Sequence, residues 1–412
     1  MSDLSQQKLF DPKTLSDPYA FYRKLHQEAP VWHDKATNIY VVTGYDAVRQ
    51  VAMQPQVFSS RVREWLREVN PTVRRVDEVY AKNGYARVET LSLSDPPKHT
   101  RYRNMVRQWF TPEKMTDAEP HVLSIVDELL DGFVARGACD FHLDFSVPMP
   151  IRVFAVQLGV VREEMGLFQK FGDAGIEAIS MVATPDREVE LAYVGVEEQK
   201  YFAAQIEKYR KTPDRLLISD LANARDESGA LYTMEELVSI IAILVLGGNE
   251  TTTNALSTAM WLMCENPGLE AELRADRSLL ENFIEEALRY QSPVHGVFRI
   301  CTKDTALAGV DIPANSRVLI NFGAANRDEK LFAQSDRFDP RREEARRHLA
   351  FGQGIKHCIG APLARLELRI AFDRILERMC DIRPETEGFV PRFAPHLVTH
   401  GMLSLPIVFR EQ

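Results

Sequence analysis

The chain has 412 residues, of which 45% are hydrophobic and 26% charged, and its formal net charge is −9. This balance is ordinary for a globular protein, and the negative charge argues against broad nucleic-acid binding, which needs a basic surface. The sequence has neither a signal peptide nor the roughly 18 uninterrupted apolar residues of a membrane anchor, so it predicts a cytoplasmic protein. Five scattered cysteines without a CxxC pair indicate reduced thiols rather than a disulfide framework.

Helical patterns dominate the chain from the N-terminus onward. The stretch "SDPYAFYRKLHQEAP" predicts a helix with Asp17 as N-cap and Pro18 as its first residue. Further along, "HVLSIVDELLDGFVARG" carries an apolar stripe at helical spacing that Gly137 ends. Short strand-like pieces occur at residues 38–45 and 317–323. No linker divides the chain, so we expect one mainly α domain over residues 1–412 with small β elements.

The longest expected helix covers residues 233–266, "TMEELVSIIAILVLGGNETTTNALSTAMWLMCEN". It starts with a capping box of Thr233 and Glu236, and its length is about 32 residues or roughly 48 Å. Because "SIIAILVL" is apolar on all sides, the helix should pass through the core. Its middle, "GGNETTTN", is unfavourable, since each glycine costs about 1 kcal/mol in a helix. Two interpretations stay open here: a tolerated kink where helices cross, or a functional break.

One cysteine, Cys358, lies in the segment "HLAFGQGIKHCIGAPLAR", residues 348–365. Gly352 and Gly354 let the backbone bend closely around a bound group, and an amphipathic helix follows. A thiol just before a helix N-terminus meets unpaired N–H groups and the positive end of the helix dipole, which favour the thiolate. A thiolate suits a nucleophile or a metal ligand, although a lone cysteine is usually a small hydrophobe. The lack of a second cysteine or of paired histidines nearby argues against zinc.

Several segments, taken in order from residue 95 to residue 365, resemble the landmarks of one family. They are "DPPKHTRYR", "LGGNETTT", "EEALR", "AANRD", "DRFDPRR" and "FGQGIKHCIG". The last is similar to the haem-binding loop of the cytochrome P450 family, and "LGGNETTT" resembles that family's oxygen-activating helix motif. The resemblance implies a mainly α cytochrome P450 fold, a helix-rich prism with a small β-rich region.

The resemblance also implies haem b, iron protoporphyrin IX, as the cofactor. Cys358 would be the axial thiolate ligand of the haem iron and would increase the electron density that favours O–O cleavage. Phe351 would cover the sulfur side. Gly352 would let backbone N–H groups approach the sulfur and tune it.

The middle of the long helix would face the other side of the cofactor. Glu250 and Thr251 match the family's acid–alcohol pair, which relays protons to bound dioxygen through water. The alternative for Thr251 is a hydroxyl bonded back to a carbonyl of its own helix. Gly247 and Gly248 would leave space above the iron for dioxygen.

Basic residues would bind the haem propionates, and here the chain departs from the family pattern. The family's histidine two residues before the cysteine is Lys356 in this chain, and His357 directly precedes Cys358. A lysine can still pair with a carboxylate as a point charge, so the choice between Lys356 and His357 stays open. The other expected propionate ligands are His99, Arg103 and Arg299.

Glu286 and Arg289 match the family's ExxR pair and, with Arg337, would form a buried structural triad below the haem. Their spacing places the first two on one helix face, and the alternative is a solvated surface pair of little energetic value. A basic patch on the cysteine side of the haem would dock an acidic ferredoxin, with these candidates: Arg107, Arg346, Arg347, Lys356 and Arg365.

The predicted function is that of a haem-thiolate monooxygenase. It would insert one oxygen atom of O2 into an apolar organic substrate by C–H hydroxylation, with electrons from NAD(P)H through a ferredoxin reductase and a ferredoxin. The alternatives are a peroxide-using peroxygenase, which would lack the acid–alcohol pair, and a non-catalytic haem-based ligand sensor.

The expected substrate is neutral and hydrophobic, such as a terpenoid or a steroid. Residues near 60–90, 170–195, 293–298 and 396–400 shape the pocket in this family, and Val294, Val297 and Val398 are candidate lining residues. An arginine among Arg63, Arg67, Arg74 and Arg75 could instead clamp a substrate carboxylate. We favour a solvated face for these arginines, because unpaired buried charge is costly.

Overall fold

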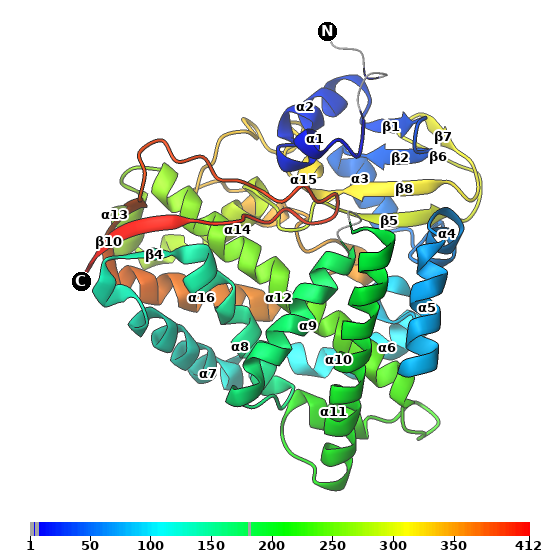
Figure 1. Cartoon of the computed structure of the whole chain (residues 1–412). Coiled ribbons are helices and arrows are strands. Elements are labelled where there is room, and N and C mark those ends of the chain that lie inside the picture. Colours follow the sequence, from blue (N-terminus) through cyan, green and yellow to red (C-terminus); the bar gives the residue numbers. More distant parts are fainter. Residues whose placement is uncertain (1–3, 5–7, 180–182) are drawn as a thin grey trace.

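Helices make up most of the computed structural model, which describes residue 4, residues 8–179 and residues 183–412. In Figure 1 they fill the lower and left parts of the molecule, and the largest sheet lies at the upper right. The helices are α1 (Pro12–Ser16), α2 (Tyr19–Glu28), α3 (Tyr45–Ala52), α4 (Arg63–Val69), α5 (Thr72–Asn83), α6 (Lys98–Arg107), α7 (Pro112–Asp131), α8 (Pro148–Gln157), α9 (Met165–Ile179), α10 (Pro185–Lys211), α11 (Leu217–Asn223), α12 (Met234–Glu265), α13 (Leu269–Ala275), α14 (Leu280–Tyr290), α15 (Phe322–Ala325) and α16 (Ala361–Arg378).

The strands form small sheets, the largest in the order β1-β2-β8-β5-β3. Strands β2 and β8 pair in parallel, with Val41 opposite Leu319, so the two strand segments predicted from the sequence are confirmed and are neighbours. Residues 318–320 of β8 are fully buried. The strands are β1 (Val31–Asp34), β2 (Ile39–Val42), β3 (Phe58–Ser59), β4 (Ala138–Asp140), β5 (Gly296–Cys301), β6 (Thr305–Leu307), β7 (Val310–Ile312), β8 (Arg317–Asn321), β9 (Met379–Pro384) and β10 (Pro406–Glu411).

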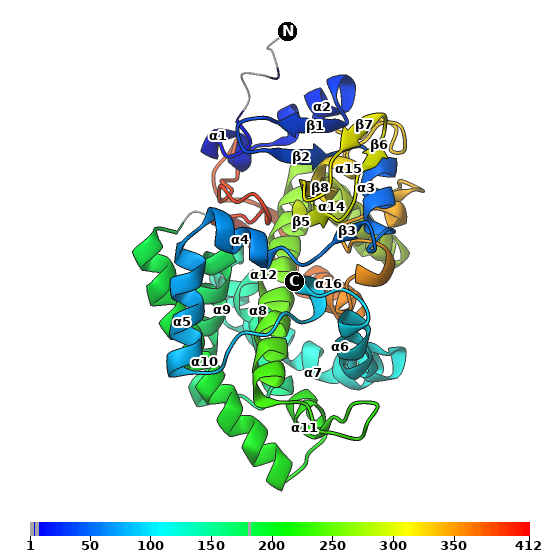
Figure 2. The ribbon, with the colours of Figure 1, turned by 90° about the vertical axis from the view of Figure 1, so that its right-hand side faces the viewer.

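Helix α12 is unbroken and runs through the middle of the molecule in Figure 2. The predicted capping box is confirmed, because Thr233 N–H donates to the Glu236 carboxylate at 2.9 Å and Glu236 N–H donates to the Thr233 hydroxyl at 3.3 Å. Buried residues within 237–245 belong to one large hydrophobic cluster, and buried residues within 255–263 belong to another. The helix therefore passes through the core, as predicted, and its glycines do not interrupt it.

Two helix boundaries differ from the prediction. Pro18 is the N-cap of α2 and Tyr19 its first residue, so the predicted cap at Asp17 was one residue early. Helix α7 ends before Gly132, and Gly137 instead closes the following 3-10 turn in a left-handed conformation with φ of 68°. Among the described residues, no helix is both long and apolar enough to cross a membrane.

Candidate active site

The loop that carries Cys358 is tightly constrained by its glycines. Gly352 and Gly354 have φ of 67° and 71°, in the left-handed region that strains other residues. A Cβ on Gly354 would lie 2.9 Å from the Ala52 carbonyl oxygen, so a larger residue does not fit there. The Cys358 N–H donates to the Phe351 carbonyl at 2.8 Å, which closes the loop just before α16.

The Cys358 thiol lies at the N-terminus of α16, as predicted, and its side chain is exposed. Although solvent reaches the side chain, the protein packed around it raises the pKa of Cys358. This desolvation is larger than the effects that lower the pKa. Those opposing effects come from the backbone N–H groups of Gly360 and Ala361 and from the guanidinium groups of Arg103 and Arg365. A thiol in these surroundings becomes a stable thiolate when a metal cation binds it.

Four basic side chains beside this loop form what we call the cation cluster: His99 and Arg103 of α6, Arg299 of β5, and Lys356 of the loop. Burial lowers the pKa of His99 to about 4, of Lys356 to about 7 and of Arg299 to about 10. Among the described residues, Asp95 is the only carboxylate that raises any of these pKa values. Because buried charge without a partner is costly, the cluster fits a ligand with two carboxylates, as haem b has.

The structure distinguishes Lys356 from His357. Lys356 points into the cation cluster and donates to carbonyls of the turn at residues 91–94. His357 is exposed, and its charged neighbours are Arg365 and Arg103. Lys356 is therefore placed to bind a propionate, an assignment that stays a prediction. Its predicted role as a surface docking charge was wrong, because its ammonium is turned inward.

The two mid-helix glycines of α12 have different surroundings. A Cβ on Gly247 would meet no atom within 4 Å, so this position is open, and its expected role above the iron stays a prediction. A Cβ on Gly248 would lie 2.9 Å from the Phe154 ring of α8. The prediction that Gly248 leaves space above the iron was therefore wrong, because this glycine allows α12 and α8 to cross closely.

Glu250 and Thr251 follow directly on α12. Burial raises the pKa of Glu250, and the side chains of Thr399 and Asn254 act against that shift. The Thr251 hydroxyl donates to the Gly247 carbonyl at 2.7 Å, which is the alternative considered from the sequence. Its oxygen retains lone pairs that can accept a hydrogen bond, so this contact is compatible with a proton relay. Thr399 lies in the segment 396–400 that was predicted to shape the pocket, but no sequence pattern pointed to its contact with Glu250.

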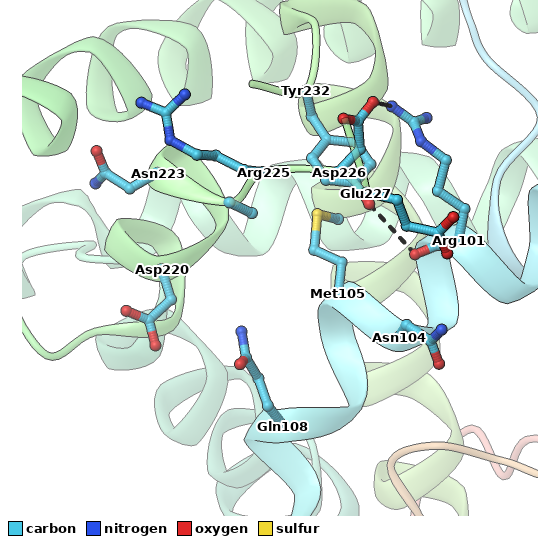
Figure 3. A pocket seen from close by; sticks show the side chains of 11 residues that line it. Arg101, Asn104, Met105, Gln108, Asp220, Asn223, Arg225, Asp226, Glu227 and Tyr232 are labelled. Carbon is cyan, nitrogen blue, oxygen red and sulfur yellow. Dashed lines mark hydrogen bonds and ion pairs between the residues drawn. The ribbon is translucent and has the colours of Figure 1, made fainter. Parts of the chain in front are cut away.

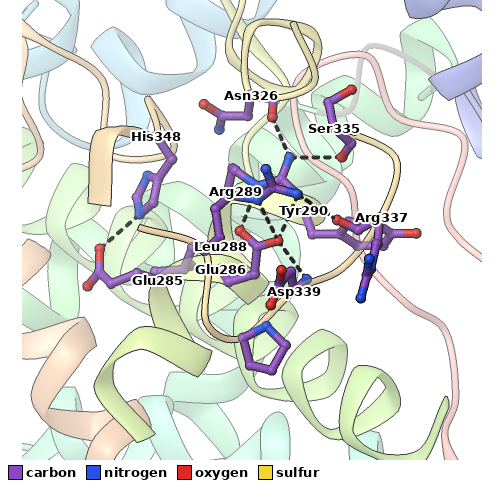
Figure 4. A network of polar contacts seen from close by, with 12 residues as sticks. Glu285, Glu286, Leu288, Arg289, Tyr290, Asn326, Ser335, Arg337, Asp339 and His348 are labelled. Atoms are coloured by element: carbon purple, nitrogen blue, oxygen red, sulfur yellow. Dashed lines mark hydrogen bonds and ion pairs between the residues drawn. The ribbon is translucent and has the colours of Figure 1, made fainter. Parts of the chain in front are cut away.

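Figure 4 shows the buried polar network around Glu286 and Arg289. Their side chains form a double hydrogen bond at 2.7 and 2.8 Å, and both are fully buried, so this is not a surface pair. The second arginine is Arg342, whose Nε donates to Glu286 at 3.2 Å. The prediction of Arg337 was wrong. A turn closed by a hydrogen bond to Gln334 leaves the Arg337 side chain exposed, and only its carbonyl accepts from Arg289.

A second ion-pair group, which the sequence did not reveal, lies beside the first. Glu285 accepts from Arg365 at 2.6 and 2.9 Å and pairs with His348 Nε2 at 3.0 Å. Although burial opposes them, these contacts lower the pKa of Glu285 to about 2. The Arg365 guanidinium lies 4.4 Å from the centre of the Phe351 ring. It therefore braces the residue expected beside the sulfur and is not a free docking charge.

The predicted pocket residues are all half-buried: Val294, Val297 and Val398. An isolated bridge joins Val294 to Thr399, so the segments 293–298 and 396–400 lie side by side. Residues 180–182 of the segment 170–195 lie outside the described residues. The pocket assignments stay predictions.

The arginines considered as substrate clamps lie on or near α4 and α5. Arg63 and Arg67 both form ion pairs with Asp77, which also binds Arg87. Arg67, Arg74 and Arg75 are exposed, and Arg63 is half-buried. These positions favour the solvated face over an inward clamp.

A surface cavity of about 480 Å³ adjoins α6. Figure 3 shows the side chains that line it. Arg101, which lines it, forms ion pairs with Asp226 and with Glu236 of the α12 capping box. The cavity includes none of the predicted site residues. This face of α6 therefore anchors the helix to the start of α12, while His99 and Arg103 of the same helix belong to the cation cluster.

Known proteins are similar to this chain in both sequence and fold. A family model described as Cytochrome P450 matches residues 194–387. The cytochrome P450 monooxygenase PikC of Streptomyces venezuelae is 35% identical over 402 residues, which cover 96% of this chain and 92% of PikC. CYP109E1 from Bacillus megaterium, solved with testosterone, has a TM-score of 0.83 at 29% identity and covers 97% of this chain and 99% of its own. P450BioI, solved with hexadec-9Z-enoic acid ligated acyl carrier protein, has a TM-score of 0.88 at 27% identity with coverage of 97% and 99%. The chain belongs to the cytochrome P450 family and is a haem b monooxygenase.

Proposed function

We propose that this monooxygenase hydroxylates a C–H bond of a neutral, apolar substrate with one atom of O2. Its electrons would come from NAD(P)H through a ferredoxin reductase and a ferredoxin. The observation that carries the proposal is the exposed Cys358 thiol at the start of α16, next to a cation cluster whose four described side chains form no ion pair with a carboxylate. A thiolate ligand and buried cations for two propionates are what haem b needs from a protein.

The cofactor would be held from two directions. Cys358 Sγ would ligate the iron, and the cation cluster would bind the propionates. The basic groups would then gain carboxylate partners in addition to the nearby Asp95. When bound, haem supplies the binding and activation of O2, which side chains alone do not provide.

Glu250 would supply protons for the reaction, and Thr251 would orient the hydrogen bonds along which they move. Because burial raises the pKa of Glu250, its carboxyl exchanges protons more readily near neutral pH than an exposed glutamate does. The Thr251 hydroxyl proton is fixed on the Gly247 carbonyl, so its oxygen is oriented to accept a hydrogen bond. A peroxygenase would lack this pair and a ligand sensor would not need it, so both residues favour a monooxygenase.

The electron donor would be an acidic ferredoxin. Arg107 and Arg347 are exposed cations. Arg346 is also exposed, but it pairs with Glu281 at 2.6 Å. Positive charge on this surface would steer an acidic partner despite the net charge of −9.

A terpenoid or a steroid fits the proposed pocket best. The candidate lining residues are apolar, and Asp77 pairs with Arg63, whose side chain is mostly buried, and with the exposed Arg67. The solved structure of CYP109E1 with testosterone supports a steroid, whereas P450BioI with an acylated carrier protein represents the acyl alternative. The shift of the haem spin state separates the two classes of ligand, because it would report a ligand that enters the pocket beside the cofactor. If fatty acids shift the spectrum and neutral terpenoids and steroids do not, the substrate proposal is wrong.

The reaction is tested by coupling. Wild-type protein with ferredoxin, reductase and NAD(P)H should form product, and peroxide alone should support little turnover. In Thr251→Ala, NAD(P)H consumption should continue while electrons are diverted to peroxide, and Thr251→Ser should retain coupling because its hydroxyl remains. If Thr251→Ala makes as much product per NAD(P)H as the wild type, the relay is wrong. Turnover with peroxide but not with the electron donors would show a peroxygenase.

A further inference from the structure

Lys356 differs from the rest of the cation cluster because it reaches a distant segment of the chain. Its Nζ donates to the Leu91 carbonyl at 2.7 Å and also to the Ser94 carbonyl. An ammonium group has three N–H bonds. One N–H therefore remains after these two contacts, and it belongs to a group that lies among His99, Arg103 and Arg299.

The turn that Lys356 holds is strained. Leu91 has φ of 35°, in the left-handed region that is unfavourable for a non-glycine residue. The Leu93 N–H donates to the Thr90 carbonyl at 2.9 Å, and the Ser94 N–H donates to the Leu91 carbonyl at 3.4 Å. Such a turn persists only when its surroundings fix it, and Lys356 supplies two of the fixing contacts.

This turn belongs to the segment that joins α5 to α6. In Figure 2 that segment crosses α12. The backbone N–H of Tyr85 donates to Gln199 of α10 at 2.9 Å, and that of Val88 donates to Ser239 of α12 at 3.0 Å. Helix α6, with two members of the cation cluster, follows directly. Segment 85–95 therefore links α10 and α12 to the cluster, and Lys356 ties the segment to the cysteine loop.

We propose that Lys356 is a positioning residue that binds the turn at residues 90–94 and a haem propionate at the same time. The inference rests on the proposed function, because it assigns the third N–H of Lys356 to the cofactor. Cofactor binding and the order of segment 85–95 are then linked through one ammonium group. A histidine in this position could bind a propionate, but its ring has too few N–H groups to hold both carbonyls as well.

Three variants separate the two halves of this proposal: Lys356→Met, Lys356→His and, as the control, Lys98→Met. Lys98 is an exposed lysine close to the same turn, so its loss removes equal charge without touching the turn or the cluster. Hydrogen exchange of the haem-loaded protein measures the order of residues 88–95. Transfer of haem to apomyoglobin measures cofactor retention. The red-shifted Soret band of the reduced carbon monoxide complex first establishes that each variant carries a thiolate haem.

Lys356→Met should show about tenfold faster exchange at Leu93 and Ser94, as expected for the loss of charge-assisted hydrogen bonds, together with faster haem loss. Lys356→His should retain haem better than Lys356→Met but keep the fast exchange at the turn. Lys98→Met should match the wild type in both measurements.

Hydrogen-exchange rates at the turn of Lys356→His that equal those of the wild type would show that the turn does not depend on the lysine and would overturn the proposal. Wild-type haem retention in Lys356→Met would overturn it as well, because Lys356 would then act on the turn alone. If the reduced carbon monoxide complex of the wild type shows no red-shifted Soret band, the proposed function is refuted instead.

Discussion

The buried charges near the cysteine loop fall into two groups with opposite balance. The carboxylate network, built on Glu285 and Glu286, gives each carboxylate at least one arginine partner within hydrogen-bonding distance. In the cation cluster, by contrast, no ion pair joins any of the four described side chains to a carboxylate within 4.0 Å. A balanced buried network is expected to position the backbone, whereas an unbalanced one indicates a place for a charged ligand.

The largest expected effect is that of replacing Cys358, the proposed iron ligand beside the cation cluster. Cys358→Ala should abolish the red-shifted Soret band of the reduced carbon monoxide complex, because no other thiolate would replace the ligand. Cys380→Ala is the matched control, since Cys380 lies on β9 and outside the site, and it should leave the band unchanged. A thiolate spectrum that survives Cys358→Ala would separate the cluster from the cofactor.

The next prediction concerns the stability that the carboxylate network gives to the fold. Arg342→Met should lower the free energy of unfolding by about 2 kcal/mol, because Glu286 is buried and loses a charged hydrogen-bond donor. Arg337→Met should change it by less than about 0.5 kcal/mol, since only the backbone of Arg337 contacts the network. Urea denaturation of the haem-loaded variants measures both values. A larger loss in Arg337→Met than in Arg342→Met would restore the assignment made from the sequence.

The sequence predicted the elements better than it predicted side-chain directions. The capping box and the apolar run determined α12, and the glycines and following helix located the Cys358 loop. Arg337 and Arg342 both lie in or beside "DRFDPRR", and only the turn of the backbone decides which side chain points inward. Likewise, Gly247 and Gly248 are adjacent in sequence but face different surroundings, because successive helix residues point in different directions.

Contacts between distant segments were out of reach of sequence reasoning. Thr399 approaches Glu250 from the C-terminal region, and Arg365 meets Glu285 of α14 and the Phe351 ring together. No local pattern marks either residue, because each contact exists only after the chain has folded. The family motifs nevertheless indicated most of the site, since they name residues that the fold brings together.

The third prediction concerns how the stability of the protein depends on pH through His99 of the cation cluster. The pKa of His99 is about 4 in the folded protein and about 6.5 in the unfolded chain. Between these values the unfolded chain binds more protons, so the stability of the cofactor-free protein should fall as the pH drops from about 6.5 toward 4. His99→Gln should flatten that dependence when Tm is measured against pH. Haem-loaded protein should also show a shallower slope, because the propionates would offset the neighbouring charges. Equal slopes in all three samples would contradict the link between His99 and an unbalanced cluster.

The smallest effect extends the comparison to the surface. Arg107 lies one turn beyond Arg103 on α6 and is exposed, whereas the charge of exposed Arg346 is offset by Glu281. Reversal of a charge at a docking surface mainly changes the association rate. We therefore expect Arg107→Glu to slow reduction by an acidic ferredoxin severalfold at low salt, and Arg346→Glu to slow it less. Stopped-flow reduction at increasing ionic strength is the measurement. The difference between the variants should shrink as salt screens the charges, because the Debye length falls from about 30 Å at 0.01 M to about 8 Å at 0.15 M. Rates that respond neither to salt nor to Arg107→Glu would show that the ferredoxin docks elsewhere.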